Sequence, residues 1–356
     1  MRQWPWILTG ISSFALALSV GCGSDFQAKR PSTKTNGDSP AVVVSELAGK
    51  LEIDGSSTVA PISTLAENQF RVNYPKVEIT VGTTGTGNGF KRFTRGETDI
   101  SDASRPIKAE EFKQCQENGV EFVELPIAYD GLTFVVHPEN AFVEQLTLDN
   151  IKAIFLEDKA AKRWKDVNPE WPDAPIKIFS PGTGSGTFDY FKEVLGKDAS
   201  IRSDISVSEN DNELVQGVAG DKNAIGFFGA SYYFANADRV KAVKIVNPKS
   251  GKAIAPAKET VLSGEYAPYS RPLFIYVNVK ALKKPEGKKF IEFYLKNANK
   301  LADEVKYFPL PDAVIELATS NVTELKAGSH FVTAEGKQRE GAFIDLFKAE
   351  NLVNTK

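Results

Sequence analysis

Short apolar runs alternate with longer amphipathic stretches along the chain from about residue 51 onward. The apolar runs have the length of buried strands, and the stretches between them repeat apolar residues at helical spacing. The predicted strands cover residues 51–54, 77–81, 122–126, 132–137, 176–179, 224–228, 240–246 and 273–277. The predicted helices cover residues 61–73, 89–95, 109–118, 148–155, 187–195, 213–219, 288–300 and 312–325. This alternation predicts an α/β architecture with mostly parallel sheets.

The first 48 residues follow a different pattern. Arg2 precedes an apolar run over residues 7–20, which is short for a bilayer span and fits the core of a signal peptide. Small residues precede Cys22 as at a bacterial lipoprotein cleavage site, although Ser19 stands where Leu is usual; the alternative is a plain signal peptide cleaved nearby. We expect a signal peptide over residues 1–22, with Cys22 as the lipidation candidate, and a flexible linker over residues 23–48. The protein is then exported and anchored to a membrane surface.

Composition and charge narrow the function classes. The chain has 356 residues, which suggests two domains, and its net charge of −3 gives no reason to expect a nucleic-acid partner. Apart from Cys22 the chain has one cysteine, Cys115, so the mature protein cannot form an internal disulfide. The two histidines, His137 and His330, do not stand in a metal-ligand pattern. We therefore expect neither a metal nor a cofactor.

Three loops rich in glycine and hydroxyl residues each stand between a predicted strand and a predicted helix. They cover residues 55–61, 82–90 and 181–187. Glycine lets a ligand approach the backbone closely, and the first N–H groups of a helix have no partner within it, so such loops suit an anion. One loop of this kind could be an ordinary turn with a Ser or Thr N-cap. Three in one chain favour an anion-binding site.

Charged candidates for the same site follow two predicted strands. Ser104 and Arg105 place a hydroxyl beside a guanidinium, whose fork of donors suits phosphate or carboxylate. The alternative for Arg105 is a surface ion pair with Asp102 or Glu110. Asp130 ends an apolar run, where a turn or cap residue is the alternative. An acid among anion donors would accept a hydrogen bond from a protonated oxyanion such as monohydrogen phosphate and would repel fully ionised sulfate.

The sequence offers no catalytic machinery for these loops. Residues 184–186 are too compact for the nucleophile elbow of a serine hydrolase, and the lysine of a nucleotide-phosphate loop is missing. An exported phosphoesterase with Ser185 or Thr187 as nucleophile would need a base or metal close by, which the sequence does not supply. We therefore expect a binding protein and not an enzyme.

The ordered motifs resemble the phosphate-binding proteins of high-affinity phosphate ABC transporters, from residue 51 to about residue 332. The matching stretches are residues 55–59, 85–90, 99–100, 103–106, 184–187, 211–218 and 224–227. Each motif alone is weak, but their order over most of the chain is specific. Residues 180–191, with the sequence SPGTGSGTFDYF, are similar to the branch found in cyanobacteria and related bacteria.

The resemblance implies a type II periplasmic-binding fold, in which two α/β lobes are joined by two crossover strands and the ligand lies in the cleft. Lobe 1 would comprise residues 49–131 and 273–356, and lobe 2 residues 132–272, with a hinge motion that closes them. It also implies a monomer that binds inorganic phosphate in the periplasm and delivers it to the permease and ATPase subunits of a transporter. A binding protein for another oxyanion, such as sulfate or molybdate, is the alternative.

Carried over by motif, residues of four loops would bind the phosphate. They are Thr58 with the amide of Val59, Thr86, Ser104 with Arg105, and Ser185, Gly186 and Thr187, with Ser57 as a further candidate. Some members have Arg-x-Asp just before Gly-Ser-Gly-Thr, where this chain has residues 181–183, so the guanidinium has to come from elsewhere and Arg105 is the obvious candidate. Those members also have an Asp where Ser104 stands. The proton-accepting acid is therefore open between Asp130, the first choice, and Asp102.

Overall fold

The computed structural model describes residues 46–183, 185–196, 199–208 and 210–355. The predicted signal peptide, Cys22 and the linker as far as residue 45 lie outside the described residues, and the first strand begins at Ala48. Within the described ranges, no helix is both long enough and apolar enough to cross a membrane.

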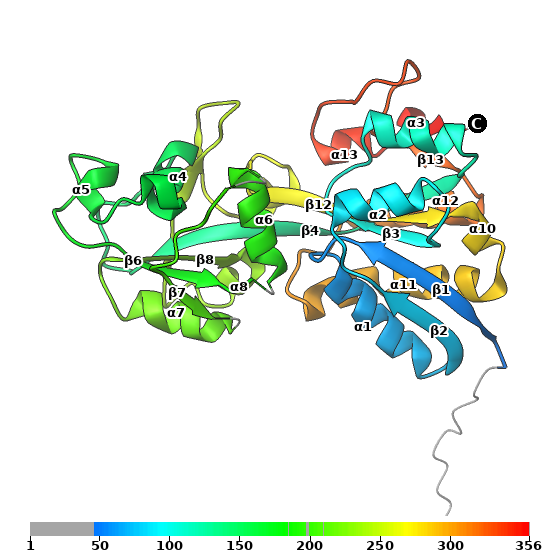
Figure 1. Ribbon diagram of the computed structural model, residues 1–356, viewed down its shortest axis with the longest axis horizontal. Coiled ribbons are helices and arrows are strands. Elements are labelled where there is room, and N and C mark those ends of the chain that lie inside the picture. Colours follow the sequence, from blue (N-terminus) through cyan, green and yellow to red (C-terminus); the bar gives the residue numbers. More distant parts are fainter. Residues whose placement is uncertain (1–45, 184, 197–198, 209, 356) are drawn as a thin grey trace, which may run out of the picture. The chain divides into compact units, whose positions relative to one another are not determined.

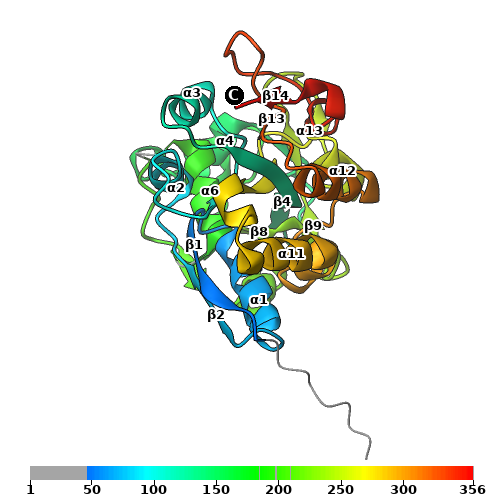
Figure 2. The same cartoon turned by 90° about the vertical axis from the view of Figure 1, so that its right-hand side faces the viewer.

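The first section of the main sheet has the strand order β2-β1-β3-β12-β4. Its strands are β1 (Ala48–Gly55), β2 (Lys76–Val81), β3 (Ile100–Ala103), β4 (Phe122–Val136) and β12 (Ser270–Asn278). Strand β1 is parallel to β2 and β3, whereas β12 is antiparallel to β3 and β4. Figure 2 shows helices on both faces of these strands. Those helices are α2 (Thr86–Phe93) and α3 (Ala109–Glu117) on one face, and α1 (Ala60–Arg71), α11 (Pro285–Glu304) and α12 (Asp312–Thr323) on the other.

The second section continues the sheet through β4 in the order β4-β8-β6-β7. Its strands are β6 (Lys177–Pro181), β7 (Ser206–Ser208), β8 (Ala224–Gly229) and the short β9 (Lys241–Ala242). Its helices are α4 (Leu148–Phe155), α5 (Trp164–Val167), α6 (Gly186–Leu195), α7 (Asp211–Ala219), α8 (Ala230–Phe234) and α9 (Lys258–Leu262). A separate sheet consists of β5 (Gln145–Leu146), β10 (Lys244–Val246) and β11 (Ala253–Ile254). The remaining elements are α10 (Val279–Leu282), β13 (Gly328–Ser329), α13 (Phe343–Leu346), β14 (Val353–Asn354) and two single 3₁₀ turns, Glu157–Lys159 and Ala349–Asn351.

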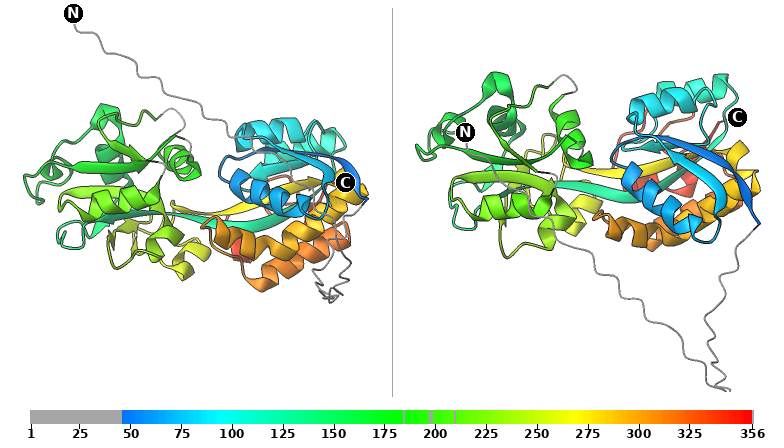
Figure 3. Two further views of the ribbon diagram at one scale, coloured as in Figure 1. Left: turned by 90° about the horizontal axis from the view of Figure 1, so that it is seen from below. Right: turned by 60° about the horizontal axis from the view of Figure 1, so that its bottom comes forward.

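Strand β4 belongs to both sections. It pairs with β12 over residues 122–131 and with β8 over residues 132–136, so its partner changes between Gly131 and Leu132. Figures 1 and 3 show β4 and β12 side by side where they leave the first section. The lobe boundaries drawn from the sequence stay a prediction, which this change of partner supports.

The α/β class is confirmed, but three details of the prediction are wrong. The strand predicted over residues 240–246 is two short strands, β9 in the main sheet and β10 in the separate sheet. Residues 122–126 and 132–137 are not separate strands, because β4 runs through both with all 15 residues buried. Asp130 breaks the apolar pattern without breaking the strand, since a buried arginine of β12 faces it. The sheet is also mixed and not mostly parallel, because β12 is antiparallel to both β3 and β4.

Apolar packing fixes the helices whose N-termini meet the site. Phe90 and Phe93 of α2 are fully buried, as are Ile62 and Phe70 of α1. Phe191 anchors α6, and its ring lies 4.2 Å from that of Phe227 and 4.9 Å from that of Phe155, measured between centroids. Aromatic pairs at such distances add to the burial energy and favour one packing arrangement.

Candidate anion-binding site

A pocket of about 570 Å³ lies where loops of the first section meet α6. Three of its walls come from the loops that follow β1, β2 and β3, and the fourth comes from α6. Beside charged residues of α2 and α3, the lining includes Ser56, Ser57, Thr58, Thr84, Gly85, Thr86, Gly87, Asn88, Ser104, Arg105, Asp189, Lys192 and Glu193. Ligands of open α/β sheets bind beyond the carboxyl ends of strands, where these loops lie.

Hydroxyl groups and a helix N-terminus form the wall made by α2. Gly85 precedes the helix with φ of 89°, a conformation that favours glycine. Its neighbour Thr86 has its Oγ1 3.0 Å from the Oγ of Ser104, and the Ser104 N–H donates to the same Thr86 oxygen at 3.2 Å. The first N–H groups of a helix lack intrahelical acceptors, so this wall offers both amide and hydroxyl donors to an anion.

The loop after β1 touches α6 directly. Thr58 Oγ1 donates to the carbonyl oxygen of Gly186 at 3.3 Å, and Ser57 Oγ donates to the carboxylate of Asp189. A Cβ at position 186 would lie 2.9 Å from the Cα of Thr58, closer than real Cβ contacts. Glycine at 186 is therefore what lets α6 approach the loop.

The predicted site residues divide into two groups. Those that line the pocket are Ser57, Thr58, Thr86, Ser104 and Arg105. Those that do not, among the described residues, are Val59, Asp102, Asp130, Ser185, Gly186 and Thr187. The Val59 N–H donates to the Ser56 carbonyl at 3.1 Å. The Thr187 N–H donates at 3.2 Å to the Oγ of Ser185, which is the N-cap residue of α6. These two amides already have acceptors within their own loops.

Arg105 lines the pocket, but its guanidinium forms an ion pair with the carboxylate of Glu111. It donates to both oxygens of Glu111, at 2.8 and 2.9 Å, and to the Pro106 carbonyl at 3.1 Å. Its Cζ lies 5.2 Å from the centroid of the Phe90 ring. The ion pair foreseen as the alternative does form, but the partner is Glu111 and neither Asp102 nor Glu110. Both glutamates stand in the first turn of α3, but Glu110 is exposed, whereas Glu111 is largely buried with both oxygens facing the guanidinium.

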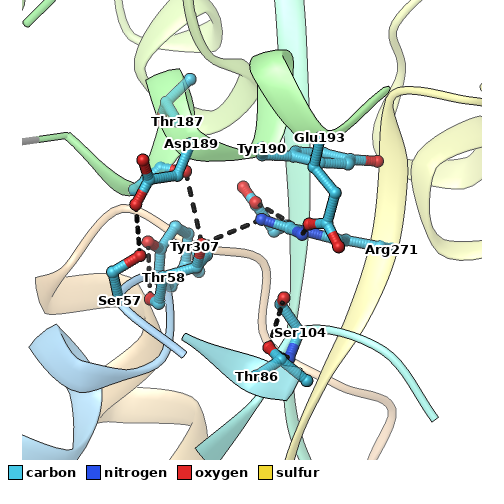
Figure 4. A network of polar contacts seen from close by, with 12 residues as sticks. Ser57, Thr58, Thr86, Ser104, Thr187, Asp189, Tyr190, Glu193, Arg271 and Tyr307 are labelled. Carbon is cyan, nitrogen blue, oxygen red and sulfur yellow. Dashed lines mark hydrogen bonds and ion pairs between the residues drawn. The ribbon is translucent and has the colours of Figure 1, made fainter. Parts of the chain in front are cut away.

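A second arginine, Arg271 at the start of β12, lies beside the pocket and was missed as a site residue. It donates through Nη2 to Thr58 Oγ1 at 2.9 Å and through Nη1 to Glu193 at 2.8 Å. Its Cζ lies 3.6 Å from the centroid of the Tyr190 ring, and its side chain is 10% exposed (Figure 4). The signal that could have found it is the antiparallel pairing of two crossover strands, which sets Arg271 opposite Asp130.

Asp130 lies behind Arg271 and does not line the pocket. Its Oδ2 accepts from the Arg271 Nε at 3.4 Å, and no described atom hydrogen-bonds to its buried Oδ1. Burial raises the pKa of this carboxyl, against the opposing effect of the Arg271 charge. A buried acid with one unused oxygen can accept or hold a proton next to the guanidinium.

Asp102 faces the interior of the first section. Ser63 Oγ of α1 donates to its Oδ1 at 3.0 Å, and the same hydroxyl lies 3.1 Å from the hydroxyl of Tyr294 in α11. Burial raises the pKa of Asp102 to about 8. Because its side chain contacts helices and not the pocket, the structure argues against Asp102 as the acid that reads a ligand proton.

The charged groups that line the pocket balance in number. The cations are Lys91, Arg105, Lys108 and Lys192, and the acids are Glu110, Glu111, Asp189 and Glu193, four against four. The pocket therefore offers an anion hydroxyls and amide N–H groups, with Arg271 beside it, and no overall positive field. Across the described ranges, no group of His, Cys, Asp and Glu side chains is placed to hold a metal ion.

Comparisons with known proteins agree with this class of site. A family model described as a PBP superfamily domain matches residues 35–298. The protein SphX of Synechococcus elongatus is 45% identical over 302 residues, which are 84% of this chain and 88% of SphX. The phosphate-binding protein PstS of Staphylococcus haemolyticus is 38% identical over 315 residues, 88% of this chain and 94% of PstS.

A solved structure extends the comparison to the fold. It is described as a possible phosphate-binding protein from Planctomyces limnophilus, is 44% identical, and superposes with a TM-score of 0.76 over 78% of this chain and 99% of its own. Fold, site and sequence thus define a member of the PBP superfamily. Within it, the chain belongs to the family of phosphate-binding proteins that includes PstS and SphX, which confirms the resemblance seen in the motifs.

Proposed function

We propose that this protein binds inorganic phosphate and delivers it to the permease and ATPase subunits of a phosphate ABC transporter. The observation that carries the proposal is one pocket of about 570 Å³ lined by hydroxyls and a helix N-terminus, with Arg271 beside it and bonded to Thr58 of the lining. The relatives that match over most of the chain include the phosphate-binding protein PstS and a solved structure described as a possible phosphate-binding protein, and such proteins work by binding and not by catalysis.

The proposed ligands of phosphate are side chains at or beside the pocket and two backbone amides that now have other acceptors. Ser57, Thr58, Thr86 and Ser104 supply hydroxyls from the pocket wall, and Arg271 supplies the guanidinium in place of Arg105. The amides of Val59 and Thr187 can join them only by leaving their present acceptors. Asp130 remains the proposed acceptor of the ligand proton, acting next to Arg271.

The two-lobed division is part of the same proposal. Residues 49–131 and 273–356 would form one lobe and residues 132–272 the other, hinged where β4 changes partner. The contacts of Thr58 with Gly186 and of Ser57 with Asp189 would then join the lobes across the pocket. Phosphate would hold the two lobes closed by binding groups of both lobes.

We also propose that the protein is exported and acts in the periplasm, attached through lipidated Cys22. The apolar run over residues 7–20 and the small residues before Cys22 support this. Mass spectrometry of the mature protein should find an N-terminus at Cys22 carrying acyl chains. A mature N-terminus elsewhere without added lipid would show a plain signal peptide instead.

Calorimetric titration of the mature protein with phosphate and with sulfate tests the function. We expect phosphate to bind at least about a hundredfold more tightly than sulfate, since an unfavourable contact with a buried acid costs several kcal/mol. In Asp130→Asn the ratio of the two affinities should fall, because the acid that repels sulfate is gone. Absence of phosphate binding, or equal affinity for sulfate, would contradict the proposal.

A further inference from the structure

Glu193 of α6 stands between the pocket and Arg271. Its carboxylate accepts from Arg271 Nη1 at 2.8 Å and also lines the pocket, whereas Arg271 does not line it. The Glu193 side chain is 42% exposed and that of Arg271 10%. Figure 4 shows Glu193 reaching from α6 to the guanidinium, with Tyr190 of the same helix stacked against it.

Each of the three nitrogens of the Arg271 guanidinium has an acceptor in the protein. Its Nε faces Asp130, its Nη2 donates to Thr58 Oγ1, and Tyr190 covers one of its planar faces. An oxyanion held by a guanidinium fork needs two neighbouring N–H groups. Nη1 donates to Glu193 and Nη2 to Thr58, so a ligand that uses both nitrogens of this fork competes with Glu193 for Nη1.

The two acids on Arg271 differ in their freedom to leave it. Asp130 is 1% exposed and lies on a central strand, so its charge cannot reach water. Glu193 is partly exposed on a helix surface, and exchange of such an ion pair for hydration costs little. A phosphate anion and the Glu193 carboxylate repel each other at one guanidinium, which makes Glu193 the group that moves.

We propose that Glu193 is a built-in competitor for the ligand: it holds the Nη1 donor of Arg271 and is displaced when phosphate binds. The inference rests on the proposed function, since it concerns the same pocket. Glu193 thereby lowers the affinity for phosphate and keeps the guanidinium oriented with a removable anion. A phosphate site that must release its ligand to a transporter gains from such a competing group.

The test compares two substitutions that separate competition from positioning. Glu193→Gln removes the charge but keeps an acceptor for Arg271, and Glu193→Ala removes both. Competition predicts that each variant binds phosphate about threefold to fivefold more tightly than the wild type, which is the gain expected when a partly exposed ion pair no longer has to be broken. Glu193→Ala should gain at least as much as Glu193→Gln. A positioning role predicts the reverse order, with Ala weakest.

Glu110→Gln is the matched control, because Glu110 lines the same pocket, loses the same charge, and has no contact with Arg271. We expect its phosphate affinity to change by less than about twofold. Denaturant midpoints of all variants show that they are folded. If the wild type binds phosphate but the Glu193 variants show no gain in affinity, or only the gain of Glu110→Gln, this inference alone is overturned. If the wild type does not bind phosphate, both this inference and the proposed function are overturned.

Discussion

Asp102 and Asp130 are both almost fully buried, but their surroundings give them different roles. Asp130 faces a guanidinium, whereas Asp102 accepts one hydrogen bond from Ser63 and its Oδ2 has no hydrogen-bond partner among the described residues. Burial disfavours the ionised carboxylate, so the pKa of Asp102 rises from 3.8 to about 8. Asp102 is therefore a neutral acid at moderate pH, and its effect on the molecule is on stability.

The raised pKa of Asp102 predicts a pH-dependent stability. The folded protein keeps the proton that the unfolded chain releases above pH 3.8, so this residue's contribution to the free energy of unfolding falls as pH rises toward about 8. Asp102→Asn lacks that proton. Its free energy of unfolding relative to wild type should rise by up to about 1 kcal/mol per pH unit between about pH 5 and about pH 8, then level off.

Urea unfolding across this pH range measures the difference. Asp303→Asn, at an exposed position of α11, controls for the loss of one negative charge and should show no such slope. Parallel stability curves for Asp102→Asn and the wild type would contradict the expectation, since they would mean that Asp102 is ionised in the folded protein throughout.

At the scale of residues, the predicted hydroxyls line the pocket, while the role of each predicted residue in binding stays a prediction. Ser57, Thr58, Thr86 and Ser104 lie in strand-to-helix loops, whose place at the pocket follows from topology. Arg105 was predicted because it is adjacent to Ser104 in sequence, and Arg271 was not among the candidates. Which of the two guanidinium groups is engaged by Glu111 depends on the docking of α3, and a local pattern does not contain that information.

Among the elements, α6 depends most on a single residue. Gly186 begins the helix, and its lack of a side chain lets Thr58 lie against the backbone. Gly186→Ala places a Cβ 2.9 Å from the Thr58 Cα, so the loop and α6 must separate. We expect phosphate affinity to fall by about tenfold, because groups on the two walls no longer meet.

Alanine favours helix more than glycine does, so Gly186→Ala should not weaken α6 itself. Gly229→Ala is the control, because a Cβ there meets nothing within 4 Å and the residue has φ of −57°. Titration with phosphate should leave the control within about twofold of wild type. An unchanged affinity in Gly186→Ala would show that the approach of α6 to Thr58 is not needed for binding.

The element pattern was predictable where periodicity is strong. The predicted helices all correspond to helices of the structure, and α4 has the predicted bounds of residues 148–155. Strand β4 was divided because polar Asp130 and flexible Gly131 look like a turn. Pairing with β12 and β8, the bridge between Tyr129 and Phe308, and the contact with Arg271 keep that stretch extended, and these are tertiary effects.

For the whole molecule, β4 and β12 are where the two sections of the sheet connect to the site. Arg271 on β12 contacts the loop after β1 through Thr58, α6 through Glu193, and β4 through Asp130. The family, and with it the α/β fold, could be predicted from ordered motifs. The arginine that joins four segments could not, because its partners lie 78 to 213 residues away along the chain.

The crossover pair of Asp130 and Arg271 should be energetically coupled, and a double-mutant cycle measures the coupling. Arg271→Gln leaves Asp130 buried without its cation, which we expect to cost about 3 kcal/mol in the free energy of unfolding. Asp130→Asn should cost less, because Glu193 and Thr58 still accept from Arg271. The double variant has no buried charge left unpaired, so its loss should be smaller than the sum of the two single losses by about 1 kcal/mol or more.

Phosphate titration of the same proteins separates stability from function. Both variants that lack Arg271 should lose most of their affinity, because the guanidinium fork is gone, even though the double variant loses less stability than the sum of the single losses. Additive losses of stability would show that the two crossover strands do not depend on this pair. Retained phosphate affinity in the stable double variant would assign the anion to Arg105 instead, and the Glu111 ion pair would then have to open on binding.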